Sequence, residues 1–286
     1  MEHLLYREVA TVSALATLFN SSAPLRSTLR VLITRTRIGT YGFRYSIGAL
    51  HRPNYAYLVY QAALQAKRLG ERRVSVIEFG VAGGAGLLAL EEHAAEVEKI
   101  FDVSIEIYGF DTGVGLPAPV DYRDLCYHWK PGFFRMDQQA LQGRLKRAKL
   151  VLGDIRDTIH TFAGKYDPAP IAAVSHDLDF HSSTAAAFKL FELDSRFILP
   201  RMVVYFDDVI GTDMELYNDF TGQRCAIHEF NDSQASRKLS PLYYLSAKGV
   251  VTPWHSQMWS FHAFDHPDYN KFIDGENQQL PVNSSF

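Results

Sequence analysis

Hydrophobic positions in the first half of the chain follow two patterns, one at helical spacing and one in short unbroken runs. A helical stripe begins at Asn54, a residue type that caps helix N-termini, and ends at Gly70. The run VSVIEF at 74–79 then predicts a buried strand. A second amphipathic helix follows, and IEIYGF at 105–110 predicts a second strand. Two strands joined by a helix indicate a parallel sheet.

Three later runs continue this alternation. Strands are predicted for KLVLGD (149–154), IAAVSHDLDF (171–180) and MVVYFDD (202–208). The segment 182–194 predicts a helix between the last two of these strands. Residues 112–148 contain three prolines and predict a long irregular loop followed by a helix that ends near Arg147.

The C-terminal part of the chain holds two strand-like runs, CAIHEF at 225–230 and SQMWSFHAF at 256–264. No long helix is predicted between them, so we expect an antiparallel pair at a sheet edge. The fold class predicted is therefore α/β, a Rossmann-like, doubly wound and mostly parallel sheet with an antiparallel C-terminal strand. We expect a single domain over 1–286, with an N-terminal helical cap (1–70) and an α/β core (71–286).

Composition narrows the class of protein. The chain has 286 residues, of which 47% are hydrophobic, enough for one large α/β domain. A net charge of −3 without a basic block disfavours nucleic acid as the main partner. Cys126 and Cys225 lie far apart, which suits a reducing compartment. No apolar run reaches the ~18–20 residues of a membrane span and no signal-peptide pattern opens the chain, so we expect a soluble, cytoplasmic protein.

Carboxylates recur at the C-terminal ends of the predicted strands. They are Glu78, Asp111, Asp154, Asp177 with Asp179, and Asp207 with Asp208. In an open parallel sheet these ends lie along one edge, and ligands bind in the crevice outside it. A single such acid could be a helix N-cap, but the whole series indicates a ligand site.

The stretch VIEFGVAGGAG at 76–86 holds four glycines at the turn between the first strand and the second helix. Such a turn lets a ligand approach the backbone and the free N–H groups of the helix. A P-loop is excluded because no Gly-Lys-Ser/Thr follows. The dinucleotide pattern matches weakly, since Ala82 stands where a glycine is required. Glu78 would repel a pyrophosphate and suits a ligand with ammonium and hydroxyl donors.

These motifs resemble class I S-adenosylmethionine-dependent methyltransferases. The branch that the chain looks most like is the macrocin O-methyltransferase type, which modifies sugars of natural products. The resemblance is carried by IEFGVAGGAG, YGFDTGVGLPAP, LVLGDIRDTI, HDLDFHSSTAAAF and VVYFDD, which together cover roughly residues 74–210. It implies a small-molecule acceptor with a hydroxyl group.

The resemblance also implies roles for individual residues. The cofactor-binding residues are expected to be Glu78, Gly80, Gly83, Gly84, Asp111, Asp154 and Ile155. The metal ligands are expected to be Asp179, Asp207 and Asp208. Their ion would be divalent, with Mg²⁺ the best candidate because it prefers a few carboxylates, waters and substrate oxygens.

The expected catalytic residues are Asp179 and His181. Where the branch carries a tyrosine after the second acid of this motif, the chain has Phe180 and His181. An imidazole titrates near neutral pH, so His181 is a candidate general base, although a surface histidine at a helix start is an equally simple interpretation.

Two other classes of function stay open at this point. An NAD-type oxidoreductase on the same fold is disfavoured by Ala82 and Glu78. A non-catalytic cofactor-binding protein is disfavoured by the retained acids. The acceptor cannot be identified from these residues, and a homo-oligomer is compatible with them.

Overall fold

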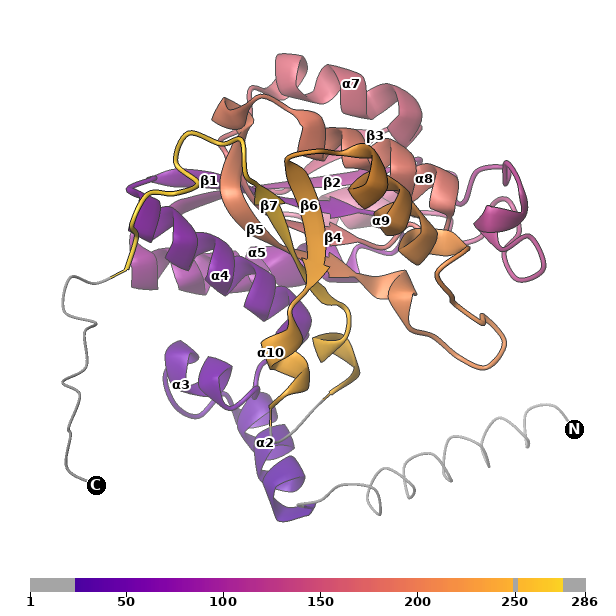
Figure 1. Cartoon of the computed structure of the whole chain (residues 1–286). Helices are drawn as coiled ribbons and strands as arrows, with labels where there is room; N and C mark the ends of the chain where they lie inside the picture. Colours follow the sequence, from indigo (N-terminus) through magenta and orange to yellow (C-terminus); the bar gives the residue numbers. More distant parts are fainter. Residues whose placement is uncertain (1–23, 249–251, 275–286) are drawn as a thin grey trace, which may run out of the picture. The chain divides into compact units, whose positions relative to one another are not determined.

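The computed structural model describes residues 24–248 and 252–274 (Figure 1). The chain divides into two compact units, residues 1–53 and 54–286, and each is described by itself. The part of the expected cap that comprises residues 1–23 lies outside the described residues. Among the helices of the described ranges, none combines the length and apolar character that crossing a bilayer requires.

In the first unit, the described residues form two helices, α2 (Pro24–Thr36) and α3 (Tyr41–Ser46). Thr40 caps α3, because its hydroxyl accepts a hydrogen bond from the Phe43 amide at 3.2 Å. The next helix, α4 (Pro53–Leu69), falls with the second unit although the sequence assigned it to the cap. It ends at Gly70, whose φ of +89° suits a glycine C-cap as expected.

The second unit is built on a seven-stranded sheet of order β3-β2-β1-β4-β5-β7-β6. The strands are β1 (Arg73–Phe79), β2 (Ser104–Asp111), β3 (Lys149–Leu152), β4 (Ile171–His176), β5 (Ile198–Phe206), β6 (Arg237–Pro241) and β7 (Met258–Ala263). The first five in this order run parallel, and β7 is antiparallel to both β5 and β6. This confirms the predicted mostly parallel sheet with an antiparallel C-terminal edge.

Helices cover both faces of the sheet. They are α4, α5 (Ala85–Phe101), α6 (Gln138–Arg144), α7 (Ile155–Tyr166), α8 (His181–Ala187) and α9 (Gly222–Ser233), with a short α10 (Tyr243–Ser246) near the end. Figure 1 shows α4 and α5 on one face and α7, α8 and α9 on the other. The fold is therefore doubly wound, as predicted.

One predicted strand is wrong. Residues 225–230 lie inside α9, where Ala226, Ile227 and Phe230 are buried at helical spacing. The antiparallel partner of β7 is instead β6, in which Leu239 alone is buried. A strand with one buried residue leaves almost no alternation in the sequence, which is why the pattern misses it.

The predicted helix over 182–194 is shorter than expected. It forms α8 and then tightens into a 3₁₀ turn over Phe188–Glu192. Phe188 and Phe191 are buried in the sheet core with Phe206 and Phe230, and the turn directs both rings inward. Large aromatic side chains at this point therefore override the helical period.

Candidate active site

The register of the sheet brings the strand-end acids together. Phe79 of β1 pairs with Phe110 of β2 and His176 of β4, and His176 pairs with Phe206 of β5. The residues that follow this buried row at the carboxyl edge are Gly80, Asp111, Asp177 and Asp207. The edge includes the point between β1 and β4 where the strand order reverses, which is where open α/β sheets bind ligands.

A pocket of about 340 Å³ opens at this edge. Seven carboxylates line it, and they are Asp111, Asp154, Asp177, Asp179, Asp207, Asp208 and Glu215. Within the described residues, no Lys, Arg or His side chain lines it. The remaining wall is largely apolar and includes Phe110, Leu116, Trp129, Phe134 and Ile155. The pocket therefore combines apolar surface with a strong excess of negative charge.

The glycine-rich turn meets the pocket at its first glycine. Gly80 has a φ of +83°, and a Cβ there would lie 1.7 Å from the Asp177 carbonyl oxygen. A side chain is thus excluded by the protein's own backbone where the chains after β1 and β4 converge. Gly83 is exposed with open space around it, and it does not line the pocket.

The other two glycines of the turn make room for side chains of the protein. A Cβ on Gly84 would lie 2.1 Å from Leu141 Cδ1 of α6. A Cβ on Gly86 would lie 1.9 Å from Glu78 Oε1 and 2.4 Å from the Tyr55 hydroxyl. These two glycines therefore serve packing beneath the turn.

Glu78 lies below the turn and outside the pocket lining. It is 2% exposed, and its Oε1 accepts a hydrogen bond from the Tyr55 hydroxyl at 2.7 Å. Burial, together with the Glu78 charge, raises the pKa of Tyr55 well above its usual value, so this hydroxyl stays a donor. The residue that the sequence assigned to the cofactor thus contacts a tyrosine of α4.

Asp111 ties the turn to the end of β2. Its Oδ2 accepts hydrogen bonds from the Val81 and Ala82 amides, both at 2.9 Å. Its Oδ1 accepts one from the Gly113 amide at 2.6 Å. The carboxylate also lines the pocket, and an ionised carboxylate can only accept hydrogen bonds.

Asp154 and Ile155 border the pocket at the end of β3. Asp154 caps α7 through the Arg156 amide at 2.9 Å and also accepts from the Arg156 guanidinium. The Arg156 hydrogen bonds lower the pKa of Asp154 despite its partial burial. The N-cap interpretation and the pocket position both hold for this residue.

Three carboxylates lie close enough to share a cation. One oxygen each of Asp177, Asp207 and Asp208 lies within 4.8 Å of the other two. This set differs from the predicted one, in which Asp179 stood in place of Asp177. Asp177 follows β4 directly and so lies beside Asp207 at the edge, whereas Asp179 is two residues further along a turn.

Asp179 is oriented by an unusual backbone. Its φ is +57°, and its amide donates to Asp208 Oδ2 at 2.9 Å. The Asp179 side chain is 7% exposed, lines the pocket and accepts no hydrogen bond from the described residues. Burial, then the charges of Asp207 and Glu215, raise the pKa of Asp179 to about 7.

Asp208 is the most deeply buried acid of the group. Its Oδ1 accepts from the Tyr217 hydroxyl at 3.2 Å, and its amide donates to Gln223 Oε1 at 3.0 Å. Burial, followed by the charge of Asp179, raises its pKa well above the usual value. We call Asp177, Asp179, Asp207 and Asp208 the carboxylate cluster.

Several residues of the site have no sequence signal. Glu215 lines the pocket from the loop after β5. Gln257 donates to the Asp207 carbonyl at 2.7 Å, and the Tyr205 hydroxyl donates to the Asp207 carboxylate. Glu215 and Gln257 reach the site from loops that no periodic pattern defines, and Tyr205 lies in β5, where the strand pattern gives no sign of its contact with Asp207.

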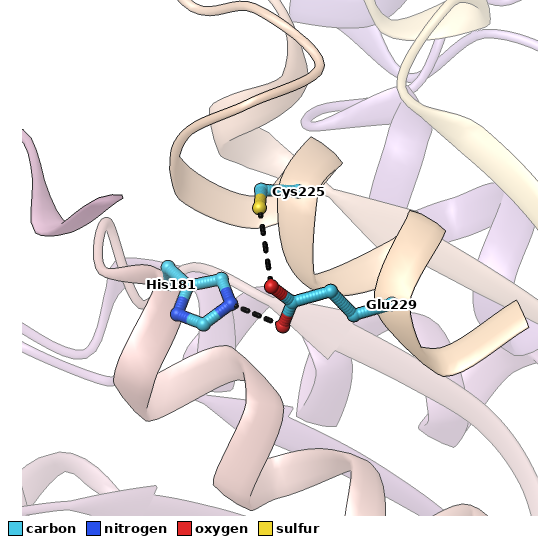
Figure 2. A group of neighbouring side chains, drawn as sticks. All are labelled: His181, Cys225 and Glu229. Carbon is cyan, nitrogen blue, oxygen red and sulfur yellow. Dashed lines mark hydrogen bonds and ion pairs between the residues drawn. The ribbon is translucent and has the colours of Figure 1, made fainter. Parts of the chain in front are cut away.

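His181 does not join Asp179 in the pocket. It is 5% exposed, and its Nε2 lies 2.7 Å from Glu229 Oε2 (Figure 2). The same nitrogen lies 3.5 Å from Arg123 Nη1. Cys225, one turn before Glu229 on α9, donates its thiol to Glu229 Oε1 at 3.6 Å. We call Arg123, His181, Cys225 and Glu229 the His181 cluster.

The His181 cluster already contains a cation. Arg123 Nη1 donates to Glu229 Oε1 at 2.8 Å, and burial, with Glu229 nearby, raises the pKa of the Cys225 thiol to about 11. A metal ion would have to displace the guanidinium and deprotonate the thiol. The arrangement therefore fits an ion-pair network better than a metal site.

Comparisons with known proteins give similarity of fold alone. No protein-family model matches the sequence, and no curated protein matches it. The chain is similar to the calicheamicin methyltransferase CalS11, at 19% identity over 85% of this chain and 93% of the other, with a TM-score of 0.47. It is similar to the O-methyltransferase NovP, at 11% identity over 85% and 99%, with a TM-score of 0.48.

A third similar structure is the plantazolicin methyltransferase BpumL in complex with a triazolic desmethylPZN analog and SAH, at 10% identity over 82% and 95%, with a TM-score of 0.34. All three are described as methyltransferases. At these TM-scores the likeness decides neither the reaction nor the substrate of this chain.

Proposed function

We propose that this protein is an S-adenosylmethionine-dependent O-methyltransferase that acts on a hydroxyl of a small molecule, such as a sugar or another natural product. The observation that carries the proposal is the carboxylate cluster in the pocket, where Asp179 is buried and accepts no hydrogen bond from the described residues. A buried carboxyl without a donor is costly, and an acceptor hydroxyl is a donor of the right kind.

The neighbouring part of the pocket suits the cofactor. Asp111 is fixed by three backbone amides and offers its free lone pairs to the ribose hydroxyls. Asp154 and Ile155 line the pocket where they would border the adenine, and Gly80 and Ala82 line it at the glycine-rich turn. Glu78 acts indirectly, by supporting the glycine-rich turn from beneath. Its carboxylate and the Tyr55 hydroxyl fill the space that a side chain at Gly86 would need. The cofactor, when bound, supplies a methyl group on a positively charged sulfur, which the negative pocket favours.

A divalent cation fits Asp177, Asp207 and Asp208. Their oxygens lie within 4.8 Å of one another, and burial raises the pKa of Asp208 in the absence of a counter-charge. A cation there compensates the ionised carboxylates, and Mg²⁺ prefers this oxygen donor set. It would also supply positive charge that lowers the pKa of a nearby hydroxyl.

Asp179 is the proposed proton acceptor. Its carboxylate takes the proton of the acceptor hydroxyl while the hydroxyl oxygen bonds to the methyl group. The methylated oxygen therefore does not keep a positive charge. The pocket walls hold the two reactants together, which is the larger part of the work in such a transfer. His181 is not assigned this role, because its Nε2 contacts Glu229 outside the pocket lining.

Titration calorimetry with S-adenosylhomocysteine on the full chain tests the proposal. We expect binding, and we expect Asp111→Asn to weaken it by about tenfold or more, because a charge-assisted hydrogen bond to the ribose is lost. Asp213→Asn, on an exposed residue of the loop after β5, is the matched control and should bind as wild type does. Folded wild-type protein that binds neither this compound nor S-adenosylmethionine would contradict the proposal.

A further inference from the structure

One long segment forms a wall of the pocket. Residues 112–137, the wall segment, contribute Leu116 and Pro117 near one end and Trp129 and Phe134 near the other. The two ends are paired, because the Leu116 amide donates to the Phe133 carbonyl at 2.9 Å and the Gly132 amide to the Leu116 carbonyl at 2.8 Å. These two hydrogen bonds link the two ends of the wall segment, and the residues between the ends make its other contacts.

The middle of the wall segment is attached to α9 and α8 by Arg123. The guanidinium donates to Asp121 Oδ2 within the segment at 2.8 Å and to Glu229 Oε1 of α9 at 2.8 Å. Glu229 Oε2 in turn lies 2.7 Å from His181 Nε2, at the first residue of α8. A guanidinium can bridge two carboxylates in fixed directions, which a lysine cannot.

Two neighbours of Arg123 strengthen this attachment. Asp124, 1% exposed, accepts hydrogen bonds from the Ser182 amide and hydroxyl, both at 2.8 Å, and so caps α8, which has no side-chain cap of its own. Leu125 is fully buried, and a Cβ on Gly222 at the start of α9 would lie 3.1 Å from its Cδ1.

The residues of α8 that hold the wall segment are close in sequence to residues that line the pocket. His181 is two residues after Asp179, and Ser183, one residue beyond Ser182, lines the pocket. The contacts of Arg123 and Asp124 therefore join the wall segment to residues that adjoin Asp179 in sequence, and Arg123 itself does not line the pocket.

We propose that Arg123 is a positioning residue that holds the wall segment against the β4–α8 turn, so that the pocket is formed before a ligand binds. The choice of S-adenosylhomocysteine as a probe below rests on the proposed function, but the proposal about the wall does not. The His181 cluster then keeps the wall segment ordered in the unliganded protein, so that a ligand loses no binding free energy by ordering it.

Hydrogen exchange and fluorescence of the unliganded full chain test the proposal. In Arg123→Gln we expect amide exchange at Leu116 and Gly132 to speed up roughly three- to tenfold, the range for losing a partly exposed ion pair with charge-assisted hydrogen bonds. Trp129 emission should shift to the red relative to wild type. The Trp129 contribution is the emission of Arg123→Gln minus that of the same variant carrying Trp129→Phe. Arg224→Gln is the matched control, since Arg224 pairs with Asp219 at 2.7 Å and has no hydrogen bond to the cluster.

Affinity for S-adenosylhomocysteine gives the second readout. We expect Arg123→Gln to bind it roughly three- to tenfold more weakly, with a thermal midpoint within a few degrees of the Arg224→Gln value. Arg123→Lys, which keeps one charged donor, should recover part of the affinity. If wild type fails to bind the probe, the proposed function fails while the exchange and emission results still decide the role of Arg123. Unchanged exchange at Leu116 and Gly132 in Arg123→Gln would overturn the proposal.

Discussion

Two clusters of ionisable side chains flank the turn between β4 and α8, and they differ in whether a basic side chain accompanies their carboxylates. The carboxylate cluster gathers four acids, with no basic side chain in the pocket lining of the described chain. The His181 cluster, two residues further along, brings its own guanidinium from the wall segment. The difference shows that a few residues of chain separate a cluster of acids without a basic side chain in the pocket lining from a cluster that includes a guanidinium.

The pKa shifts of the acids in the two clusters have opposite signs. Burial raises the pKa of Asp179 to about 7 and that of Asp208 well above its usual range. Burial also acts to raise the pKa of Glu229, but hydrogen bonds and charges from His181 and Arg123 outweigh it and lower the value. Ionised acids thus cost stability in the carboxylate cluster and contribute stability in the His181 cluster.

The largest expected effect is on cation binding. Asp207→Asn should weaken binding of Mg²⁺ or Mn²⁺ by about 100-fold or more, because it removes a charged ligand from a three-carboxylate set. Titration calorimetry measures this, and Asp213→Asn is again the control. Equal cation affinity in wild type and Asp207→Asn would contradict the proposal that the carboxylate cluster, unlike the His181 cluster, binds a cation.

Asp179→Asn should stabilise the protein in EDTA. The folded pKa of Asp179, about 7, lies above its unfolded value, so ionisation destabilises the fold above pH 7 and this cost disappears as the pH falls towards 4. The gain should be on the order of 2–4 kcal/mol at pH 8 and near zero at pH 4. Urea unfolding at both pH values measures it. A gain that is the same at both would show that charge is not its cause.

Glu229→Gln should have the opposite sign and a smaller size. The folded pKa of Glu229 is below its unfolded value, so its contribution is present at neutral pH and is lost as the pH falls through the folded pKa. We expect a loss of about 0.5–1 kcal/mol at pH 7, since the carboxylate is half exposed. Asp232→Asn, exposed on the same helix, should leave urea unfolding unchanged.

Cys225→Ser should have the smallest effect. The thiol makes one long hydrogen bond, to Glu229 at 3.6 Å, and a hydroxyl can replace it. We expect a change below about 0.5 kcal/mol in the free energy of unfolding. A large loss would show that the packing of the thiol matters more than its hydrogen bond, and binding of Zn²⁺ by wild type that Cys225→Ser abolishes would show that the cluster holds a metal in place of Arg123.

Much of the fold could be predicted because its elements have strong periods. The strands β1, β2 and β4 are mostly buried and rich in apolar residues, and acids follow at or near their C-terminal ends. β6 could not be predicted, because Leu239 alone is buried in it and the amphipathic spacing of α9 was interpreted as a strand.

The site was predicted less completely than the fold. Asp111, Asp154, Ile155 and Gly80 do line one pocket, and Asp179 joins Asp207 and Asp208 there. The exchange of Asp177 for Asp179 in the three-carboxylate set depends on sheet register, which sequence spacing does not fix. The positions of Glu78 and His181 depend on Tyr55 and Arg123, which come from segments remote in the sequence.

The buried row beneath the acids includes His176, which is fully buried and contacts Phe79, Phe188 and Phe206. Burial lowers the pKa of this imidazole to about 3, so it stays neutral directly under Asp177. The buried row therefore adds no positive charge beneath the carboxylates at neutral pH. Any charge that balances these acids has to come from groups other than the residue directly below them.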